Sequence, residues 1–222
     1  MKEILLIITQ FTLASFICCL ADRAISGQAL WTSRSYCFNC GHPLAWYDLI
    51  PLLSAPILKF RCRNCGQVFT SVSEWLFFEG LFPLLMLTIP FQWSAAYFLH
   101  FFLFFLARED SQKERAHTDM VWLLIPYFLF FNDGISHDEP VFILLKVFFL
   151  LLNFPLIYLR KMGVGDFPVF VLAAVMFDGE AFTNFIFAST FSTLICVPLM
   201  IKKRKIPFLP FLLFSWIITE LI

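Results

Sequence analysis

The chain has 222 residues, of which 60% are hydrophobic and 14% are charged, and its formal net charge at pH 7 is zero. Its mean hydropathy of +0.80 excludes an intrinsically disordered chain and an ordinary soluble domain, and it indicates an integral membrane protein. The lipid bilayer is therefore an expected partner. Nucleic acid is not an expected partner, although the zero net charge by itself says nothing about one.

Eight apolar runs follow one another along the chain, and each is predicted to be a transmembrane helix. They cover residues 4–20, 75–90, 93–107, 120–131, 141–159, 167–177, 182–201 and 206–222. We therefore expect an all-α integral membrane fold. The runs at 120–131 and 167–177 are short: at about 1.5 Å per residue they reach roughly 16–18 Å, against about 30 Å of hydrocarbon. No cleavable signal peptide is expected, because the first run has neither a basic n-region nor a small-residue cleavage site.

A polar segment, residues 21–74, separates the first two runs and carries two copies of one pattern. Cys37 and Cys40 form the first Cys-x-x-Cys-Gly motif, and Cys62 and Cys65 form the second, each with Asn before its second Cys. Four thiols at such a spacing predict a closed, structural Zn²⁺ site, and the Gly after each pair permits a tight turn. The alternative is a pair of disulfides, which needs an oxidising compartment.

The basic residues indicate how the chain is oriented. If the polar segment is cytoplasmic, 14 of the 16 Lys and Arg residues lie on the cytoplasmic side, as the positive-inside rule requires. These residues are Arg23, Arg34, Lys59, Arg61, Arg63, Arg108, Lys113, Arg115, Arg160, Lys161 and the run Lys202–Lys205. This orientation places both termini outside and the four thiols in a reducing compartment, which favours zinc over disulfides.

Charged residues elsewhere have other expected roles. Lys146 lies inside the run at 141–159, where we expect it to be an interior partner for a carboxylate. The acidic residues assigned to the opposite loops are expected to be solvated. They are Asp133, Asp138, Glu139, Asp178 and Glu180.

Two further carboxylates fall at the cytoplasmic face. Asp166 ends a Gly-x-Gly-Asp motif directly before the run at 167–177, and Asp110 follows the run at 93–107. Alone, Asp166 is equally well interpreted as a helix N-cap. Two carboxylates within hydrogen-bonding distance share one proton, so one can activate water while the other protonates a leaving amine. Asp110 and Asp166 are therefore the candidate catalytic residues.

Other acidic residues are alternatives at this site. Asp119 begins the fourth run on the same face and is the alternative partner for Asp166. Glu109 adjoins Asp110, but on a continuing helix its side chain points about 100° away. Glu79, in the second run, is either a buried polar group or part of the site.

With these motifs in place, the chain resembles the type IV prepilin peptidase family, which are membrane aspartic proteases with a Gly-x-Gly-Asp motif. The segments that carry the resemblance are Ser15-Phe16, Arg34–Cys37, Leu44–Ser54, Arg61–Cys65, Glu79 and Gly163–Asp166. In the family, the first catalytic Asp is followed after five residues by Leu-Pro-Asp, whereas here Asp119 comes one residue late. Aligning Met120 with the Leu that follows in the family keeps Asp110 as the first catalytic position, with Asp119 as the alternative.

The apolar runs and the resemblance together imply three domains. Residues 1–20 form the first transmembrane helix, and residues 21–74 form a cytoplasmic zinc-binding segment similar to a zinc ribbon. Residues 75–222 form a membrane aspartic protease core with about seven helices. The implied location is the inner (cytoplasmic) membrane of a bacterial cell, with a multi-pass topology.

The resemblance further implies an endopeptidase that cleaves the leader peptide of type IV prepilins or pseudopilins at the cytoplasmic membrane face, with Asp110 and Asp166 as the catalytic dyad. Such processing serves type IV pili, protein secretion or competence. Family members of this form often also N-methylate the new N-terminus, which implies S-adenosylmethionine as a cofactor beside the structural Zn²⁺. The alternative is a non-catalytic zinc-ribbon membrane assembly factor derived from such a peptidase.

Overall fold

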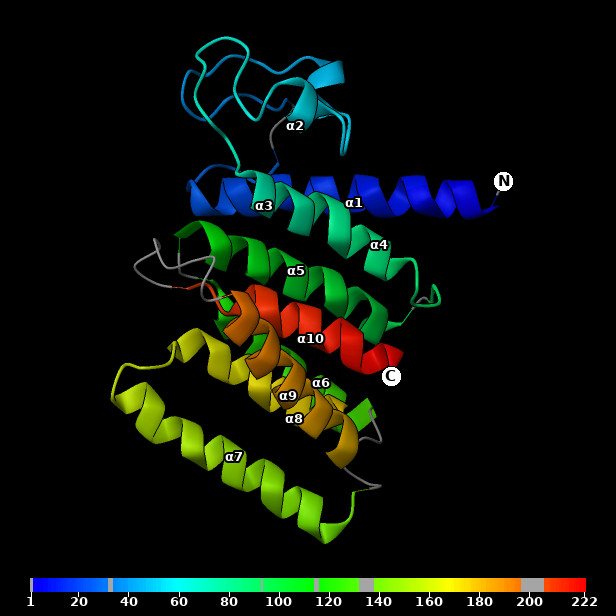
Figure 1. Ribbon diagram of the computed structural model, residues 1–222, viewed down its shortest axis with the longest axis vertical. Helices are drawn as coiled ribbons and strands as arrows, with labels where there is room; N and C mark the ends of the chain where they lie inside the picture. Colours follow the sequence, from blue (N-terminus) through cyan, green and yellow to red (C-terminus); the bar gives the residue numbers. More distant parts are fainter. Residues whose placement is uncertain (1, 32–33, 93, 114–115, 132–137, 197–205) are drawn as a thin grey trace. The chain divides into compact units, whose positions relative to one another are not determined.

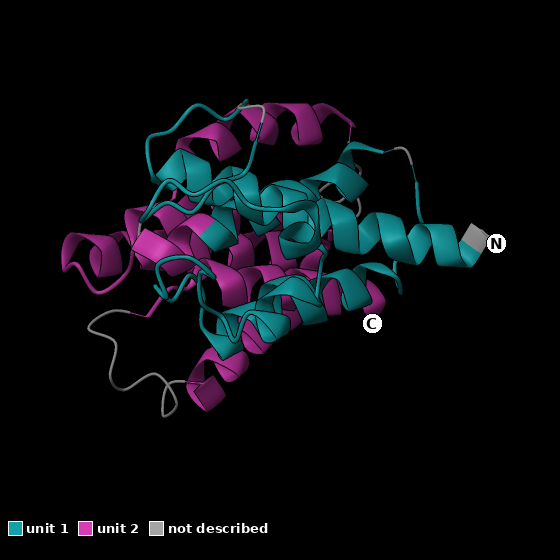
Figure 2. Cartoon of the chain, turned by 90° about the horizontal axis from the view of Figure 1, so that it is seen from above, with its two compact units in different colours: residues 1–108 teal, residues 109–222 magenta. Residues whose placement is uncertain are grey.

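The computed structural model describes residues 2–31, 34–92, 94–113, 116–131, 138–196 and 206–222. The chain divides into two compact units, Met1–Arg108 and Glu109–Ile222, which have different colours in Figure 2. The described residues form helices and no named strands, with two isolated β-bridges, so the expected all-helical class is confirmed. Three predicted features, the basic run Lys202–Lys205, Arg115 and Asp133, lie outside the described residues.

Unit 1 begins with the long helix α1, Lys2–Ile25, and its other long helix is the first part of α5, Ala95–Lys113. Between them the chain forms the short elements η1, Trp46–Leu49, and α2, Ser54–Ile57, and then a helical stretch from Val72 to Met86 (Figure 1). That stretch consists of α3, Val72–Trp75, the π-helical segment η2, Leu76–Leu81, and α4, Phe82–Met86.

The stretch from Val72 to Met86 begins at an N-cap residue, Ser71. Ser71 accepts a hydrogen bond from the backbone N–H of Glu74 at 3.2 Å, which satisfies a donor that the first helical turn leaves free. Further along, Phe82 stacks on Phe104 of α5, with ring centroids 3.9 Å apart. Aromatic burial of this kind packs α4 against α5 within unit 1.

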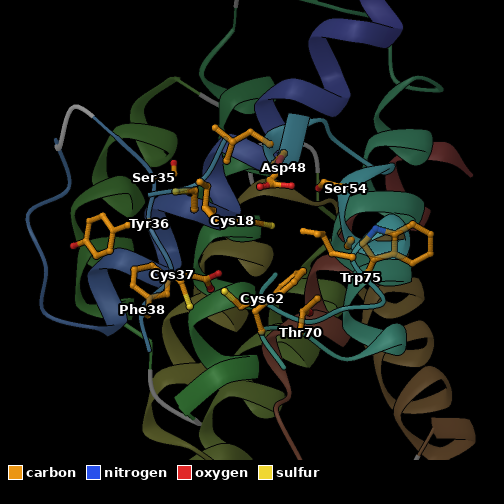
Figure 3. A pocket seen from close by; sticks show the side chains of 18 of the residues that line it. Cys18, Ser35, Tyr36, Cys37, Phe38, Asp48, Ser54, Cys62, Thr70 and Trp75 are labelled. Carbon is orange, nitrogen blue, oxygen red and sulfur yellow. The ribbon is translucent and has the colours of Figure 1, made fainter. Parts of the chain in front are cut away.

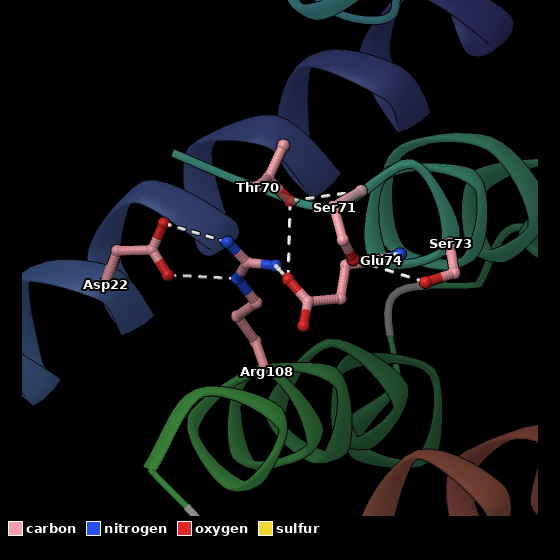
Figure 4. A network of polar contacts seen from close by, with 6 residues as sticks. All are labelled: Asp22, Thr70, Ser71, Ser73, Glu74 and Arg108. Carbon is pink, nitrogen blue, oxygen red and sulfur yellow. Dashed lines mark hydrogen bonds and ion pairs between the residues drawn. The ribbon is translucent and has the colours of Figure 1, made fainter. Parts of the chain in front are cut away.

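A buried arginine ties three helices of unit 1 together (Figure 4). The Arg108 guanidinium donates two hydrogen bonds to the Asp22 carboxylate at 2.9 and 3.1 Å, and it lies 3.9 Å from Glu74. Its side chain is only 6% exposed. Arg108, predicted to be one of the cytoplasmic cations, thus lies inside α5 and joins that helix to α1 and α3.

Unit 2 contains two short helices after the end of α5. They are α6, Val121–Phe131, which follows the turn η3, Thr118–Met120, and α8, Phe167–Met176, which follows the turn η4, Val164–Asp166. The predicted shortness of these two helices is confirmed. The other helices that the structure describes in this unit are α7, Pro140–Tyr158, α9, Gly179–Cys196, and α10, Leu209–Leu221, which packs against α9.

A buried ion pair joins α7 to the connection between α8 and α9. Lys146 donates hydrogen bonds to Asp138 and to the Phe177 carbonyl oxygen, the latter at 2.6 Å. The other Asp138 oxygen accepts from the Gly179 N–H at 2.6 Å, at the start of α9. The predicted carboxylate partner of Lys146 is confirmed. The predicted solvation of Asp138 is wrong, because its side chain is 2% exposed and a buried ammonium needs a counter-charge.

By length and apolar composition, two of the described helices can cross a bilayer: Glu3–Ile25 in α1 and Pro140–Tyr158 in α7. Three shorter apolar helices are Thr118–Phe131, Val164–Met176 and Leu209–Leu221. The described parts of all eight predicted apolar runs are largely helical. Their arrangement as eight membrane spans stays a prediction.

We predict that Asp22→Asn destabilises the protein by about 3–5 kcal/mol, because it leaves the buried Arg108 charge without its bidentate partner. Thermal unfolding of the purified protein measures the effect. Glu180→Gln is the control, since Glu180 is exposed in the first turn of α9 and its substitution should cost no more than about 0.5 kcal/mol. Equal shifts for the two variants would contradict this account of the fold.

Candidate functional site

The four cysteines predicted as metal ligands come together in unit 1. The Sγ atoms of Cys37, Cys40, Cys62 and Cys65 all lie within 4.8 Å of one another. Two of the separations, Cys37 to Cys65 and Cys40 to Cys62, are 3.8 and 4.0 Å. A tetrahedral ion with metal–sulfur bonds of about 2.3 Å needs sulfur atoms about 3.8 Å apart. The cluster therefore fits a tetrahedral metal ion.

The two motifs have the same backbone geometry. In each, the glycine N–H donates to the carbonyl oxygen of the first cysteine: Gly41 to Cys37 at 2.8 Å and Gly66 to Cys62 at 2.9 Å. The φ angles of these glycines are +70° and +69°, a conformation that side-chain-bearing residues rarely adopt. The glycine after each cysteine pair is thus required by the turn that gathers the thiols.

Backbone N–H groups favour the thiolate form of the second cysteine in each motif. The His42 N–H lowers the pKa of Cys40, and the Gln67 N–H lowers the pKa of Cys65 to about 6. Burial instead raises the pKa of Cys37 to about 11. A cation in the cluster would favour the thiolate of Cys37 as well.

The asparagine of each motif donates a hydrogen bond to a cysteine of the other motif. Asn39 Nδ2 donates to Cys65 Sγ at 3.6 Å, and Asn64 Nδ2 donates to Cys40 Sγ at 3.7 Å. Each motif thereby contacts a sulfur of the other, which gives the cluster an approximate two-fold symmetry. The repeated Asn in the sequence was the signal for this arrangement, but its cross-motif direction requires the folded structure.

A cavity of about 420 Å³ lies beside the cluster within unit 1 (Figure 3). Its walls come from α1, the two cysteine motifs, the helical stretch from Val72 to Met86, and Arg108 of α5. Carboxylates of Asp22 and Glu79 line it, together with the indole of Trp75. The buried Nε1 of Trp75 has no hydrogen-bond partner among the described residues. The cavity thus combines aromatic walls with acidic groups and one unused donor.

Glu79 lies in unit 1 and lines this cavity. Its carboxylate accepts a hydrogen bond from the Leu52 N–H at 3.4 Å. Leu52 has a φ of +64°, which costs energy for a residue with a side chain. Glu79 therefore holds a strained turn of the cysteine-containing segment against η2.

In unit 2, the Gly-x-Gly-Asp motif forms the turn η4. A side chain at Gly163 would place its Cβ 2.9 Å from Asp166 Oδ2, and one at Gly165 would place its Cβ 3.0 Å from Thr118 Oγ1. Both glycines are therefore needed for close approach: the first leaves room for the Asp166 carboxylate, and the second lets η4 pack against η3. Asp166 itself lies in the turn, before the apolar helix α8.

The structure brings the charges of Asp110 and Asp166 within range of each other. Burial and the negative charge of Asp110 raise the pKa of Asp166 to about 7. Asp110 also accepts a hydrogen bond from the Leu209 N–H at 3.2 Å, at the start of α10. Asp119, the alternative partner, lies in η3 and is exposed.

Sequence reasoning missed the role of Glu109 as a hydrogen-bond acceptor. Its side chain is fully buried, and it accepts hydrogen bonds from both the backbone N–H and the Nδ1 of His117. An acidic residue beside a candidate catalytic residue carries no sequence signal for such a role. The contact appears only when η3 folds back toward the end of α5.

We predict that Asn39→Ala and Asn64→Ala each weaken Zn²⁺ binding by about 10–100-fold, because outer hydrogen bonds to metal ligands typically have effects of this size. Competition with a chromogenic chelator measures the affinity. Gln67→Ala is the control, since its backbone N–H to Cys65 remains. Unchanged affinity in both Asn variants would show that their hydrogen bonds do not support a bound metal.

The comparisons with known proteins agree with these motifs. Residues 8–93 match the family model described as the bacterial peptidase A24 N-terminal domain. A prepilin leader peptidase/N-methyltransferase of Myxococcus xanthus is 41% identical over 63 residues, which are 28% of this chain and 19% of that protein. A protein of the same name from Vibrio cholerae is 27% identical over 117 residues, 50% of this chain and 46% of that protein.

The matched regions thus cover less than half the length of either relative. No solved structure matches the chain. The family match covers most of α1, both cysteine motifs and the helical stretch from Val72 to Met86, which build the cluster and most of the cavity wall. These findings confirm the resemblance to the prepilin peptidase family that the motifs indicate.

Proposed function

We propose that this protein is a membrane aspartic endopeptidase that removes the leader peptide from type IV prepilins or pseudopilins. The observation that carries the proposal is the η4 turn, whose two glycines hold Asp166 within range of the Asp110 charge. The names of both relatives support a prepilin substrate.

The two carboxylates have different roles because one carries a proton and the other is charged. With its pKa raised to about 7, Asp166 still carries its proton in mildly acidic and near-neutral solution, while Asp110 supplies the negative charge. Asp110 then acts as the general base that takes a proton from the attacking water, and Asp166 acts as the acid that donates to the peptide group being cleaved. Each aspartate is regenerated when the proton passes back after cleavage.

The proposed site suits a substrate held in the bilayer. Asp166 lies where a turn gives way to the apolar helix α8, which is where the basic leader of a membrane-embedded substrate would meet its apolar helix. We place the site at the cytoplasmic face of a bacterial inner membrane in a multi-pass chain with both termini outside, because this orientation puts 14 of the 16 basic residues inside.

We assign the cysteine cluster to a structural Zn²⁺ ion. Four thiolates complete the tetrahedral shell and leave no open position, so the ion would stabilise the fold rather than take part in the reaction. The segment that carries the motifs has few buried apolar residues, and metal binding supplies the folding free energy that such a segment lacks.

A second activity, N-methylation of the new N-terminus, is favoured by the cavity in unit 1 and by the relatives' names. A volume of about 420 Å³ suits a small-molecule ligand. Aromatic walls and the carboxylate of Glu79 fit S-adenosylmethionine, which has an aromatic base and a positive sulfonium, and the free Trp75 N–H offers it a donor. When bound, this cofactor supplies the methyl group.

Leader cleavage of a prepilin co-expressed in membranes tests the proposal. We predict that Asp166→Asn and Asp110→Asn each reduce cleavage at least 10³-fold, because removing an essential acid or base costs about that much, whereas Asp119→Asn retains activity. Mass spectrometry of the mature N-terminus reads methylation in the same samples. If a properly inserted parent protein cuts none of several prepilins, the non-catalytic assembly factor becomes the better account.

The pH dependence provides a separate prediction. Because Asp166 is the proton donor and its pKa is about 7, the dyad loses its proton as the pH rises, and kcat/KM should fall about tenfold per pH unit above about pH 7. The loss should reverse when the pH returns to neutrality, which excludes unfolding as its cause. A rate that stays level or rises up to about pH 9 contradicts the assignment of Asp166 as the acid.

A further inference from the structure

We infer that Glu109 is a positioning residue for the aspartate pair, acting through His117 to fix the turn η3 against the Gly-x-Gly-Asp turn. The inference rests on the proposed function, because it concerns the geometry of Asp110 and Asp166. Neither the family match nor the proposed peptidase chemistry gives Glu109 a role.

Glu109 and His117 form a contact between a buried carboxylate and an exposed imidazole. Glu109 is fully buried, whereas the His117 side chain is 68% exposed. One Glu109 oxygen accepts the His117 backbone N–H at 3.0 Å, and the other lies 2.9 Å from His117 Nδ1. A buried carboxylate is retained only where such bonds satisfy it. Buried Glu109 is therefore the immobile partner, and its contacts hold His117 in position.

The residue next to His117 reaches the turn that carries the other aspartate, Asp166. The residue after His117 is Thr118, which is buried and begins η3. Thr118 Oγ1 lies 3.0 Å from the position that a Cβ would take at Gly165, so only a glycine there allows this approach without displacement. Gly165 directly precedes Asp166.

The contacts therefore form one continuous path between the two aspartates. Asp110 adjoins Glu109, Glu109 holds His117, and Thr118 abuts Gly165 beside Asp166. If Glu109 releases His117, η3 loses its anchor at the end of α5, and the support for the η4 turn weakens. Catalysis depends on such placement because a displacement of about 1 Å at a catalytic group can cost about 10²-fold in rate.

His117→Ala and His117→Asn form the decisive pair of variants. Both remove the imidazole, and both keep the backbone N–H bond to Glu109, but the Asn amide can donate to Glu109 in place of Nδ1. We expect His117→Ala to lower kcat for prepilin cleavage about tenfold with KM unchanged, and His117→Asn to restore most of the loss. Glu109→Ala, which removes both hydrogen bonds, should lower kcat further, by about 10²-fold.

The pH–rate profile depends on the geometry of the site, so it distinguishes a positioning role from a general loss of stability. In His117→Ala, Asp166 should be less buried and farther from Asp110, so the alkaline limb of the pH–rate profile should move to lower pH relative to His117→Asn. Loss of folded protein alone would lower the rate without moving this limb. If Glu109→Ala fails to fold, the His117 pair still decides, because both variants leave the buried carboxylate in place.

The variants distinguish a wrong positioning role from a wrong peptidase mechanism. If Asp166→Asn is inactive but His117→Ala keeps the parent's kcat and pH profile, the positioning role is wrong and the peptidase stands. Equal losses in His117→Ala and His117→Asn also overturn it, since the hydrogen bond then makes no difference. If Asp166→Asn cleaves as the parent does, the aspartate mechanism fails and the role of Glu109 falls with it.

Discussion

A charge buried in an apolar protein must be paired, because desolvation of an isolated ion costs more than the fold can supply. Four interactions of the described residues meet this demand: Arg108 with Asp22 and Arg63 with Asp48 in unit 1, and Lys146 with Asp138 and Glu109 with His117 in unit 2. Each joins elements that are separate along the chain. Asp110 and Asp166 are different, because two carboxylates repel each other, and one of them must then keep its proton. Among the described residues, these pairs satisfy buried charges, whereas the proposed catalytic site holds two acidic groups near each other.

Glycine serves the two halves of the chain in different ways. Gly41 and Gly66 have positive φ angles and close the turns that gather four thiols. Gly163 and Gly165 are needed because a side chain would crowd Asp166 and Thr118. The same residue type therefore builds the cysteine cluster through backbone conformation and the carboxylate turn through lack of bulk.

Features that depend on local pattern could be predicted from the sequence. The cysteine cluster follows from motif spacing, and the helices follow from apolar runs, including the short α6 and α8. Pairings between distant residues could not be predicted: Asp22 gives no sign that it meets Arg108, and Asp138 looks like a loop charge until the chain places Lys146 beside it. The meeting of Asp110 and Asp166 was suggested by their shared membrane face and by the family motif, not by any local signal.

On this account, Asp166 holds a proton near neutrality because it is buried and because the negative charge of Asp110 is close to it. Infrared difference spectroscopy of the purified protein across a pH titration tests this most directly, since it detects a protonated carboxyl group. We predict a carboxyl signal with a midpoint near pH 7 that is absent in Asp166→Asn and moves to lower pH in Asp110→Asn. A midpoint near the ordinary aspartate value of about 3.9, or one that Asp110→Asn leaves unchanged, contradicts the account.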